Sequence, residues 1–566
     1  MSGQGISQIV VYSIVLVALG YPLGLWMARV YGSWRGPRWL EAIENGFYRV
    51  VRTDPSKEQA WQAYGVTVLV FSVCFTLLLY AILRLQHGLF LNPDNLAAVQ
   101  PHIAINTTAS FVTNTNWQYY GGEFTMSYLS QMAGLAVQNF VSAGVGMAVL
   151  AAVVRGISRR SASTLGNFWR DLYRSVVYIL LPLSIVLAVI LISQGVVQTF
   201  AGHATATTVE GAQQAIARGP AASQIAIKQL GTNGGGFFNS NSSVPFENAT
   251  GLSNFFEMLA ILLIPAAQVF MFGRMVLARR HAWMVFIAMF AMFAIGVAVN
   301  LPSEQHGSQV LRDSGVNLTQ GHGSSGGNMS DKEVRFGLAN STTWTVATSD
   351  ASNGSVNNGF DAQTPAGGAV PLVNLFVGEV IFGGVGSGLY GMFFYIIIAV
   401  FVAGLMVGRT PEWLGKKIES REIKIAAIGA LFVPTMVLTL TALAVVLPDG
   451  LASIYNSGVH GFTESLYAYD SQSNNNGSAF AGYGATNFSA EMGVLALYLG
   501  RFVPLIAALA LGSTLGAKKT VPASAGTFRT DGPTFVVLLV GVIALTAGLM
   551  IFPALTLGPI VEGLMG

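Results

Sequence analysis

Long apolar stretches separated by polar segments recur along the whole chain. A helix needs about 20 consecutive apolar residues to cross a bilayer, and ten stretches reach that length. We therefore predict an all-α polytopic fold with ten membrane spans. The predicted spans are Ile6–Val30, Trp61–Gln86, Met126–Arg155, Asp171–Phe200, Gly251–Leu277, Ala282–Leu301, Val370–Val407, Lys424–Leu447, Ala490–Leu515 and Pro533–Leu555.

One of these stretches, Val370–Val407, is too long for a single straight crossing. At about 1.5 Å per residue, a continuous helix would be nearly twice the roughly 30 Å thickness of the hydrocarbon core. Its middle, Phe382–Gly391, is rich in glycine. We expect one broken span, because two crossings would move the Arg409–Lys424 basic cluster to the outer side. Close helix packing through small residues is the alternative use of these glycines.

Composition and charge agree with a membrane protein. Of 566 residues, 52% are hydrophobic and only 10% are charged, unlike a soluble globular protein. With the N-terminus outside, most of the 29 Lys and Arg residues fall in loops on the inner side, as the positive-inside rule requires. No basic stripe interleaved with aromatics occurs, so we expect no nucleic-acid partner. The single cysteine, Cys74, is expected to be buried, and the polar segment Pro302–Gly337 to form a surface loop.

A second pattern consists of four short polar runs, each between two apolar stretches. We call them the first to fourth polar runs: Thr113–Gln118, Gln229–Asn239, Ala351–Ser355 and Asn474–Ser478. With the N-terminus outside, all four open to the outer side. Such a repeat indicates re-entrant loops, each preceded by a half-helix whose C-terminal end favours a cation. Taken alone, the glycine-rich second run could equally be an ordinary outside loop.

The residue types in the runs indicate what they bind. Thr, Asn and Gly offer closely spaced backbone carbonyls that can replace the water shell of a cation. The central residues of the runs include no Asp or Glu, whereas Ca²⁺ and Mg²⁺ prefer carboxylates. We therefore predict a site for a monovalent cation, K⁺ before Na⁺. Lys228, close to the second run, is expected to face protein or the outer vestibule.

The spans and runs divide the chain into units of span, descending segment, polar run and span. The division is an N-terminal flanking helix with a cytoplasmic loop (1–60), four repeats (61–155, 171–277, 282–407 with a broken second helix, and 424–515) and a C-terminal flanking helix (533–566).

Longer motifs around the runs resemble a known family. Val112–Gln118, Gly231–Asn239, Pro245–Asn248, Gly378–Gly391 and Gly408–Lys417 are similar to the signatures of the potassium-transporting ATPase A subunit, the channel-like part of the bacterial Kdp complex. The resemblance covers essentially the whole chain. It implies the fold of the superfamily of K⁺ transporters, in which four fused helix–pore loop–helix repeats have a pseudo-four-fold arrangement with one flanking helix at each end.

The resemblance also implies which residues bind the ion. Carried over by position, each run contributes three residues, which we call its triplet. Asn116 stands where the other triplets have glycine, and Ser349–Asp350 offers a competing start for the third. The triplets are Asn114, Thr115, Asn116; Thr232, Asn233, Gly234; Ser352, Asn353, Gly354; and Asn475, Asn476, Gly477. The remaining matches are Gln118, next to the first triplet, and a gate loop beneath the ion-binding triplets with Gly383, Gly384, Gly386 and Gly388.

Three ionisable residues lie within or at the ends of predicted spans. An intramembrane charge is a functional hypothesis by default. We hypothesise that Glu379 lies near the cation path and that Arg501 balances a nearby carboxylate; a structural ion pair is the alternative. Arg409 lies at a cytoplasmic end, where snorkelling explains it.

The sequence thus predicts a K⁺-binding and translocating subunit of an ATP-driven uptake complex in the bacterial plasma (inner) membrane. No nucleotide-binding or phosphorylated-aspartate motif occurs, so we expect no catalytic site and no organic cofactor, with ATP bound by a partner. The resemblance implies three partners within the lipid bilayer, namely the catalytic P-type ATPase (B) chain, a C chain and a small F chain. Alternatives are a stand-alone K⁺ or Na⁺/K⁺ transporter of the same superfamily and a membrane enzyme that uses the glycine-rich stretch for a cofactor.

Overall fold

The fold is a bundle of long helices. The computed structural model describes residues 3–321, 325–406, 408, 410–522 and 527–565. In this part of the chain ten helical segments are long and apolar enough to cross a membrane, as the apolar pattern predicts. They are built from α1 (Gly3–Tyr31), α3 (Trp61–Leu85), η2 and α6 (Ser130–Ala136 and Val137–Ser158), α7, η3 and α8 (Phe168–Ser175, Val176–Leu180 and Leu181–Ser193), α10 (Gly251–Met275), α11 (Arg279–His306), α15 (Ser387–Met406), α16 (Ser420–Val446), α19 (Asn487–Ala517) and α20 (Pro533–Leu555).

Four shorter helices end at the polar runs, and we call them pore helices. They have 10 to 17 residues, too few at about 1.5 Å per residue to cross the membrane. Every residue of the second one except Ser223 is buried, so its C-terminal end lies inside the protein. The pore helices are α4 (Pro101–Val112), α9 (Ala221–Leu230), α13 (Gly337–Asp350) and α18 (Gly458–Asn474).

The predicted break in the long apolar stretch is confirmed. Helix α14 (Pro365–Phe376) ends before α15 begins, and residues 377–386 between them are not helical. We call these residues the gate loop; Gly388 lies outside it, in the first turn of α15. Helix α14 begins earlier than the apolar pattern suggests, because the Thr364 side chain caps it by accepting a hydrogen bond from the Gly367 amide.

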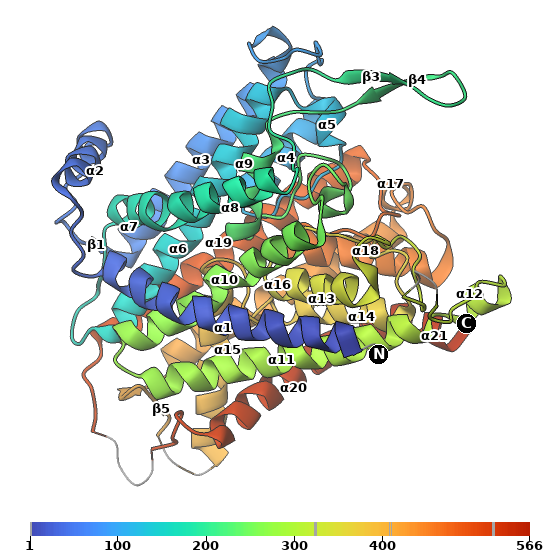
Figure 1. The fold of residues 1–566 in the computed structure, drawn as a ribbon. Coiled ribbons are helices and arrows are strands. Elements are labelled where there is room, and N and C mark those ends of the chain that lie inside the picture. The colour runs from blue at the N-terminus through green and yellow to red at the C-terminus, as the bar shows by residue number, and fades with distance from the viewer. Residues whose placement is uncertain (1–2, 322–324, 407, 409, 523–526, 566) are drawn as a thin grey trace.

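Short elements lie at the two ends of the bundle. One end, the basic face, carries α2 (Arg38–Val50), the β1–β2 pair (Gln59–Ala60 and Thr164–Gly166) and the β5–β6 pair (Glu412–Trp413 and Lys416–Lys417). The other end, the vestibule face, carries the β3–β4 hairpin (Ala204–Thr207 and Gln213–Ile216), η1 (Gln86–Gly88), α5 (Gly122–Thr125), η4 (Asn241–Ser243), α12 (Gln309–Asp313), α17 (Pro448–Leu451), η5 (Thr556–Ile560) and α21 (Val561–Met565). Figure 1 shows both chain ends near α12 and α21, away from α2 and β5.

Two expectations about polar and apolar packing are wrong. The segment Pro302–Gly337 is only partly a surface loop, because α11 continues to His306 and a fully buried ion pair joins Glu304 to Lys332 at 2.8 Å. Cys74, expected in the interior, is exposed on the membrane span α3. An apolar surface that faces lipid is as hydrophobic as a core, so hydropathy does not distinguish the two.

Candidate functional site

The four triplets share one backbone conformation. In each, the first and third residues have positive φ, a region that residues other than glycine seldom adopt. Ser349 and Asp350 are the last residues of α13, so the shared conformation begins at Ser352 in the third run. The angles are 67° and 57° at Asn114 and Asn116, 48° and 83° at Thr232 and Gly234, 50° and 87° at Ser352 and Gly354, and 62° and 99° at Asn475 and Gly477.

The amide hydrogens of the triplets are turned back into the protein. In each triplet the second and third N–H groups donate to one residue near the end of the preceding pore helix. Because N–H and C=O point in opposite directions in a trans peptide, the carbonyls of these peptides turn away from the pore helices. The bonds run from Thr115 and Asn116 to Ser110 O (2.9 and 3.2 Å), from Asn233 and Gly234 to Lys228 O (2.8 and 3.3 Å), from Asn353 and Gly354 to Thr348 O and Oγ1 (3.1 and 3.0 Å), and from Asn476 and Gly477 to Ser471 O and Oγ (2.8 and 3.0 Å).

The triplets contact one another in a closed ring, in the order first, second, third, fourth. Three of the contacts are so close that a side chain cannot fit, which accounts for the glycine that ends three triplets. The ring closes where Asn114 Nδ2 donates to the carbonyl of Thr232 at 2.9 Å. An added Cβ would lie 1.7 Å from Asn353 O at Gly234, 2.2 Å from Asn476 O at Gly354, and 2.0 Å from Thr115 O at Gly477.

The first triplet ends in Asn116 because its neighbour leaves room for a side chain. The side-chain amide of Asn116 donates through Nδ2 to Oδ1 of Asn139 on α6 at 2.9 Å. Across the contact stands Gly235, where an added Cβ would lie 2.5 Å from the Cβ of Asn116. Gln118 fixes the same junction, since it donates to the carbonyl of Gly236 (3.1 Å) and accepts from its amide (3.0 Å). The extra glycines of the second run therefore accommodate the one departure from four-fold symmetry.

A cavity opens from the ring to the vestibule face. It has a volume of about 280 Å³, and its lining includes residues of all four runs, among them Asn116, Gly235, Gly354 and Gly477. Asp331 also lines this vestibule, and burial raises the pKa of its carboxyl group. Within the ring itself the triplets are buried, apart from the half-buried Gly477. An ion that reaches the ring from the vestibule would therefore lose its water to backbone oxygens.

Comparison with known proteins decides the family. Residues 10–564 match the sequence model of the family described as the potassium-transporting ATPase A subunit. The chain belongs to this family. It is 53% identical over 577 residues to a potassium-transporting ATPase potassium-binding subunit of Sorangium cellulosum, and 54% identical over 570 residues to one of Methylobacterium nodulans. The matches cover 100% of this chain and 99% and 98% of those relatives.

A solved structure shares the fold of this family member. The potassium transporter TrkH from Vibrio parahaemolyticus superposes with a TM-score of 0.51, covering 89% of this chain and 98% of that one. The sequence identity is 14%, so this likeness is evidence for the fold alone. It agrees with the predicted fold class of an all-α membrane protein.

The gate loop lies directly against the ring on the side away from the vestibule. The amide of Gly383 donates to Asp350 O at 2.8 Å, and that of Val385 donates to Thr232 Oγ1 at 2.9 Å. The Gly386 amide donates to Gln268 of α10 at 2.8 Å. Close packing, the alternative role of these glycines, also occurs, because a Cβ on Gly386 would lie 2.0 Å from the carbonyl oxygen of Gly146.

The predicted intramembrane charges have mixed outcomes. Glu379 lies in the gate loop and accepts a hydrogen bond from Asn476 of the fourth triplet at 2.6 Å. Arg501 forms no ion pair among the described residues, and its Nη2 has no hydrogen-bond partner there. It nevertheless lies close enough to Glu379 for its positive charge to act on that carboxyl group, in agreement with the hypothesis that it balances a nearby carboxylate. Arg501 also lines a cavity of about 60 Å³ beside Asn475. Arg409 lies outside the described residues.

Two buried carboxylates below the ring are not among the predicted site residues. Asp350 ends the third pore helix, and neither of its carboxylate oxygens has a hydrogen-bond partner in the described structure. Asp470 on the fourth pore helix accepts from Asn474 at 2.8 Å and leaves its second oxygen unpaired. Their position in the sequence is a usable signal, because each carboxylate lies shortly before a polar run, although neither lies within one.

Lys228 faces protein, as expected. Its ammonium group is fully buried and forms an ion pair with Glu247. Glu247 also accepts from the amide of Phe238 at 2.8 Å, which ties the end of the second run to α9. The partner carboxylate neutralises the lysine, so Lys228 does not repel a cation from the ring.

Proposed function

We propose that this chain is the component that binds K⁺ in a Kdp potassium-transporting ATPase and passes the ion to a pumping partner. The printed name of its close relatives, potassium-binding subunit, supports this function. The observation that carries the proposal is the closed ring of four triplets with one backbone conformation, in which the second and third amide hydrogens of each triplet turn back toward the pore helix. Backbone carbonyls arranged in this way can replace the hydration shell of K⁺. Hydrolysis of ATP belongs to the partner.

The proposed site consists of the four triplets, with each of the ranges 61–155, 171–277, 282–407 and 424–515 supplying one quarter of the ring. Gln118 holds the first quarter against the second. Below the ring lie three buried carboxyl groups, those of Glu379, Asp350 and Asp470, and in their ionised form they would attract a dehydrated cation. The gate loop stands in the straight path, and the cavity beside Arg501 supports a lateral exit.

The proposed assembly places the chain in the bacterial inner membrane with its N-terminus and its vestibule outside. Two observations support this orientation. The basic face carries Arg155, Arg159 and the β5–β6 lysines, as expected of a cytoplasmic side. The N-terminal helix begins at the opposite face, where Asn340 donates to Gln8 at 3.2 Å. The proposed partners are the catalytic P-type ATPase (B) chain, the C chain and the small F chain of the Kdp complex.

The alternative is a stand-alone K⁺ or Na⁺/K⁺ transporter, and the shared fold is compatible with both functions. Purification of the chain from its native membrane distinguishes the two functions. Co-purification of a P-type ATPase chain with K⁺-stimulated ATP turnover supports the pump component. K⁺ flux by the isolated chain in proteoliposomes supports the stand-alone transporter.

The decisive variant is Gly234→Asp, measured in the purified complex. An added Cβ at this position would lie 1.7 Å from the carbonyl oxygen of Asn353, so the ring must deform. We expect the K⁺ concentration for half-maximal ATP turnover to rise at least about ten-fold, which corresponds to about 1.4 kcal/mol. Gly211→Asp is the matched control, because its φ of 86° is equally positive but nothing lies within 4 Å. An unaltered ion response in the Gly234 variant would contradict the site.

A further inference from the structure

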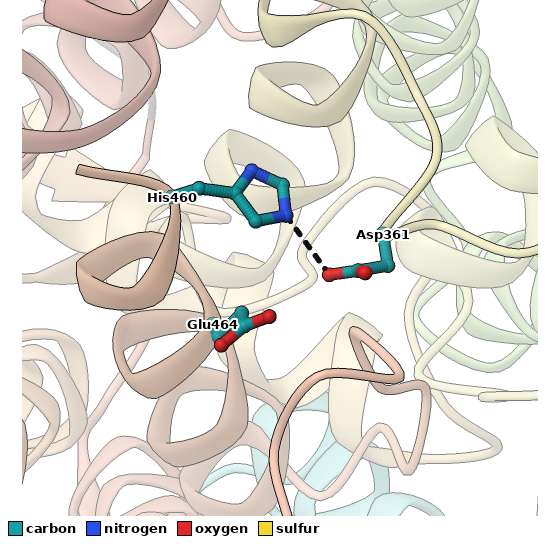
Figure 2. A group of neighbouring side chains, drawn as sticks. All are labelled: Asp361, His460 and Glu464. Carbon is teal, nitrogen blue, oxygen red and sulfur yellow. Dashed lines mark hydrogen bonds and ion pairs between the residues drawn. The ribbon is translucent and has the colours of Figure 1, made fainter. Parts of the chain in front are cut away.

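Three side chains that the K⁺ site does not use meet on the vestibule face. His460 and Glu464 lie one turn apart on the same side of α18, and Asp361 comes from the segment after the third polar run. Each offers one ligand atom, and these atoms all lie within 4.8 Å of one another. Figure 2 shows the imidazole of His460 directed at Asp361, with Nε2 and Oδ1 3.1 Å apart.

A fourth residue fixes the direction of the imidazole. Glu562 of α21 lies 2.8 Å from Nδ1 of His460, so this nitrogen is occupied by a carboxylate outside the cluster. The arrangement matches the one found behind metal-bound histidines, where a carboxylate on one ring nitrogen orients the other toward the metal. In this way Nε2 is presented to the space between Asp361 and Glu464.

The charges around the cluster are unbalanced. Asp361, Glu464 and Glu562 are three carboxylates around one imidazole. In the described part of the chain, none of the three forms an ion pair with a lysine or arginine. Glu464 is fully buried, and the hydrogen bonds that reach it come from the neutral backbone and side-chain amides of Asn456. A buried carboxylate without a cation is costly, and a divalent ion would remove that cost.

We propose that Asp361, His460 and Glu464 bind a divalent transition-metal ion of the Zn²⁺ type. A mixed imidazole and carboxylate set suits Zn²⁺ better than Mg²⁺ or Ca²⁺, which prefer oxygen ligands alone. The three ligands close around the ion to about 2.0–2.2 Å, and a fourth position stays open to water. The ion joins the fourth pore helix to the segment after the third run, and Glu562 extends the connection to the C-terminal helix.

The test is calorimetric titration of the full chain in its purified complex with Zn²⁺ alone, in buffer that contains excess Mg²⁺. We expect one Zn²⁺ per chain in the wild type and no saturable binding in His460→Ala or Asp361→Asn. Glu562→Gln keeps all three ligands, so its affinity should fall only about 10–100-fold. His306→Ala is the control, because this histidine is exposed at the end of α11 on the same face. X-ray absorption should show a nitrogen ligand at about 2.0–2.1 Å.

Two results would overturn the site: a wild type that binds no Zn²⁺, or a His460→Ala variant that binds as tightly as the wild type. The cluster is then an ion-pair contact between α18 and the chain end. Assembly of each variant is checked by K⁺-stimulated ATP turnover without Zn²⁺. If the histidine variant does not assemble, the near-isosteric Glu464→Gln replaces it and should weaken binding by at least ten-fold.

Discussion

The third residue of each triplet decides how closely neighbouring triplets approach. At three positions it is glycine, and the next carbonyl occupies the place where a Cβ would stand. In the first triplet this third residue is Asn116, and its side chain fits because a glycine, Gly235, stands opposite it. Ring size, and with it the fit to the ion, is thus set by contacts that a single methyl group can change.

Gly354→Ala should therefore weaken K⁺ binding by about ten-fold or more. The new Cβ would lie 2.2 Å from the carbonyl oxygen of Asn476, so it must displace the fourth triplet. Strain of about 1.4 kcal/mol in the ring accounts for a ten-fold loss of K⁺ affinity. Gly315→Ala is the control, because φ at Gly315 is 77°, close to the 87° at Gly354, but nothing lies within 4 Å of the added Cβ. K⁺-dependent ATP turnover measures both variants, and equal effects would show that backbone strain alone, not the contact, is responsible.

Glu379→Gln separates charge from hydrogen bonding beneath the ring. The amide oxygen of glutamine can still accept the bond from Asn476, observed at 2.6 Å, so only the negative charge is lost. A loss of about 1 kcal/mol of attraction for the cation would weaken K⁺ affinity about five-fold. Unchanged K⁺ affinity and transport in this variant would remove Glu379 from the ion path.

At the scale of elements, three backbone amides of the gate loop donate hydrogen bonds to neighbouring segments. The acceptors are Asp350 of the third pore helix, Thr232 of the second triplet and Gln268 of α10. Of these acceptors, only the Gln268 side chain belongs neither to a triplet nor to a pore helix, so it can be changed without touching the ring. This separates the role of the loop from that of the site.

Gln268→Met should loosen the gate loop and leave ion binding unaltered. The Gly386 amide loses its acceptor, and an unsatisfied buried donor costs about 1–3 kcal/mol. We expect a higher K⁺ leak through the complex in proteoliposomes without ATP, at unchanged half-maximal K⁺ for turnover. Gln213→Met, in an exposed strand of the β3–β4 hairpin, is the control. A leak rate equal to that of the control would show that the loop is held by packing alone.

On the basic face, an ion pair joins Glu58, which precedes β1, to Arg159, which follows α6. Hydrogen bonds from Arg159 and Thr164 lower the pKa of Glu58 to about 2 against an ordinary 4.5. Because the folded-state pKa is the lower one, the pair stabilises the fold above about pH 4.5 and loses this effect as the pH falls to about 2. Glu58→Gln should reduce stability at pH 6 by no more than about 1 kcal/mol, since the pair is partly exposed. The deficit should shrink in melting curves at lower pH, whereas a pH-independent deficit would point to packing.

The sequence predicts elements and runs well, because both depend on local chemistry. Lipid demands long apolar helices, and a ring of carbonyls demands Thr, Asn and Gly, so Val370–Val407 and the four runs stand out by composition alone. Contacts between distant segments were not predictable. The surroundings of Arg501, whose Nη2 has no hydrogen-bond partner in the described structure, the Lys228–Glu247 pair and the exposure of Cys74 depend on which segments meet, and no single stretch encodes that.

At the scale of the whole molecule, the vestibule and both chain ends share one face, while the basic clusters share the other. Uptake requires that K⁺ meet the ring from outside. Under the proposed uptake function, we therefore expect the β3–β4 hairpin, which lies on the vestibule face, to be external and the loop before β1 to be internal. The positive-inside rule leads to the same orientation independently.

Cysteine labelling in sealed right-side-out vesicles tests this orientation. In a Cys74→Ser background, Val209→Cys at the exposed tip of the hairpin should react with a membrane-impermeant maleimide. Ser56→Cys, exposed beside β1 on the basic face, should react only after the vesicles are opened. The Cys74→Ser background alone is the control, because Cys74 is itself exposed on α3. The reverse labelling pattern would mean that the vestibule opens to the cytoplasm. Because a ring that opens inward cannot collect K⁺ from outside, that result would contradict the uptake function but not the ion site.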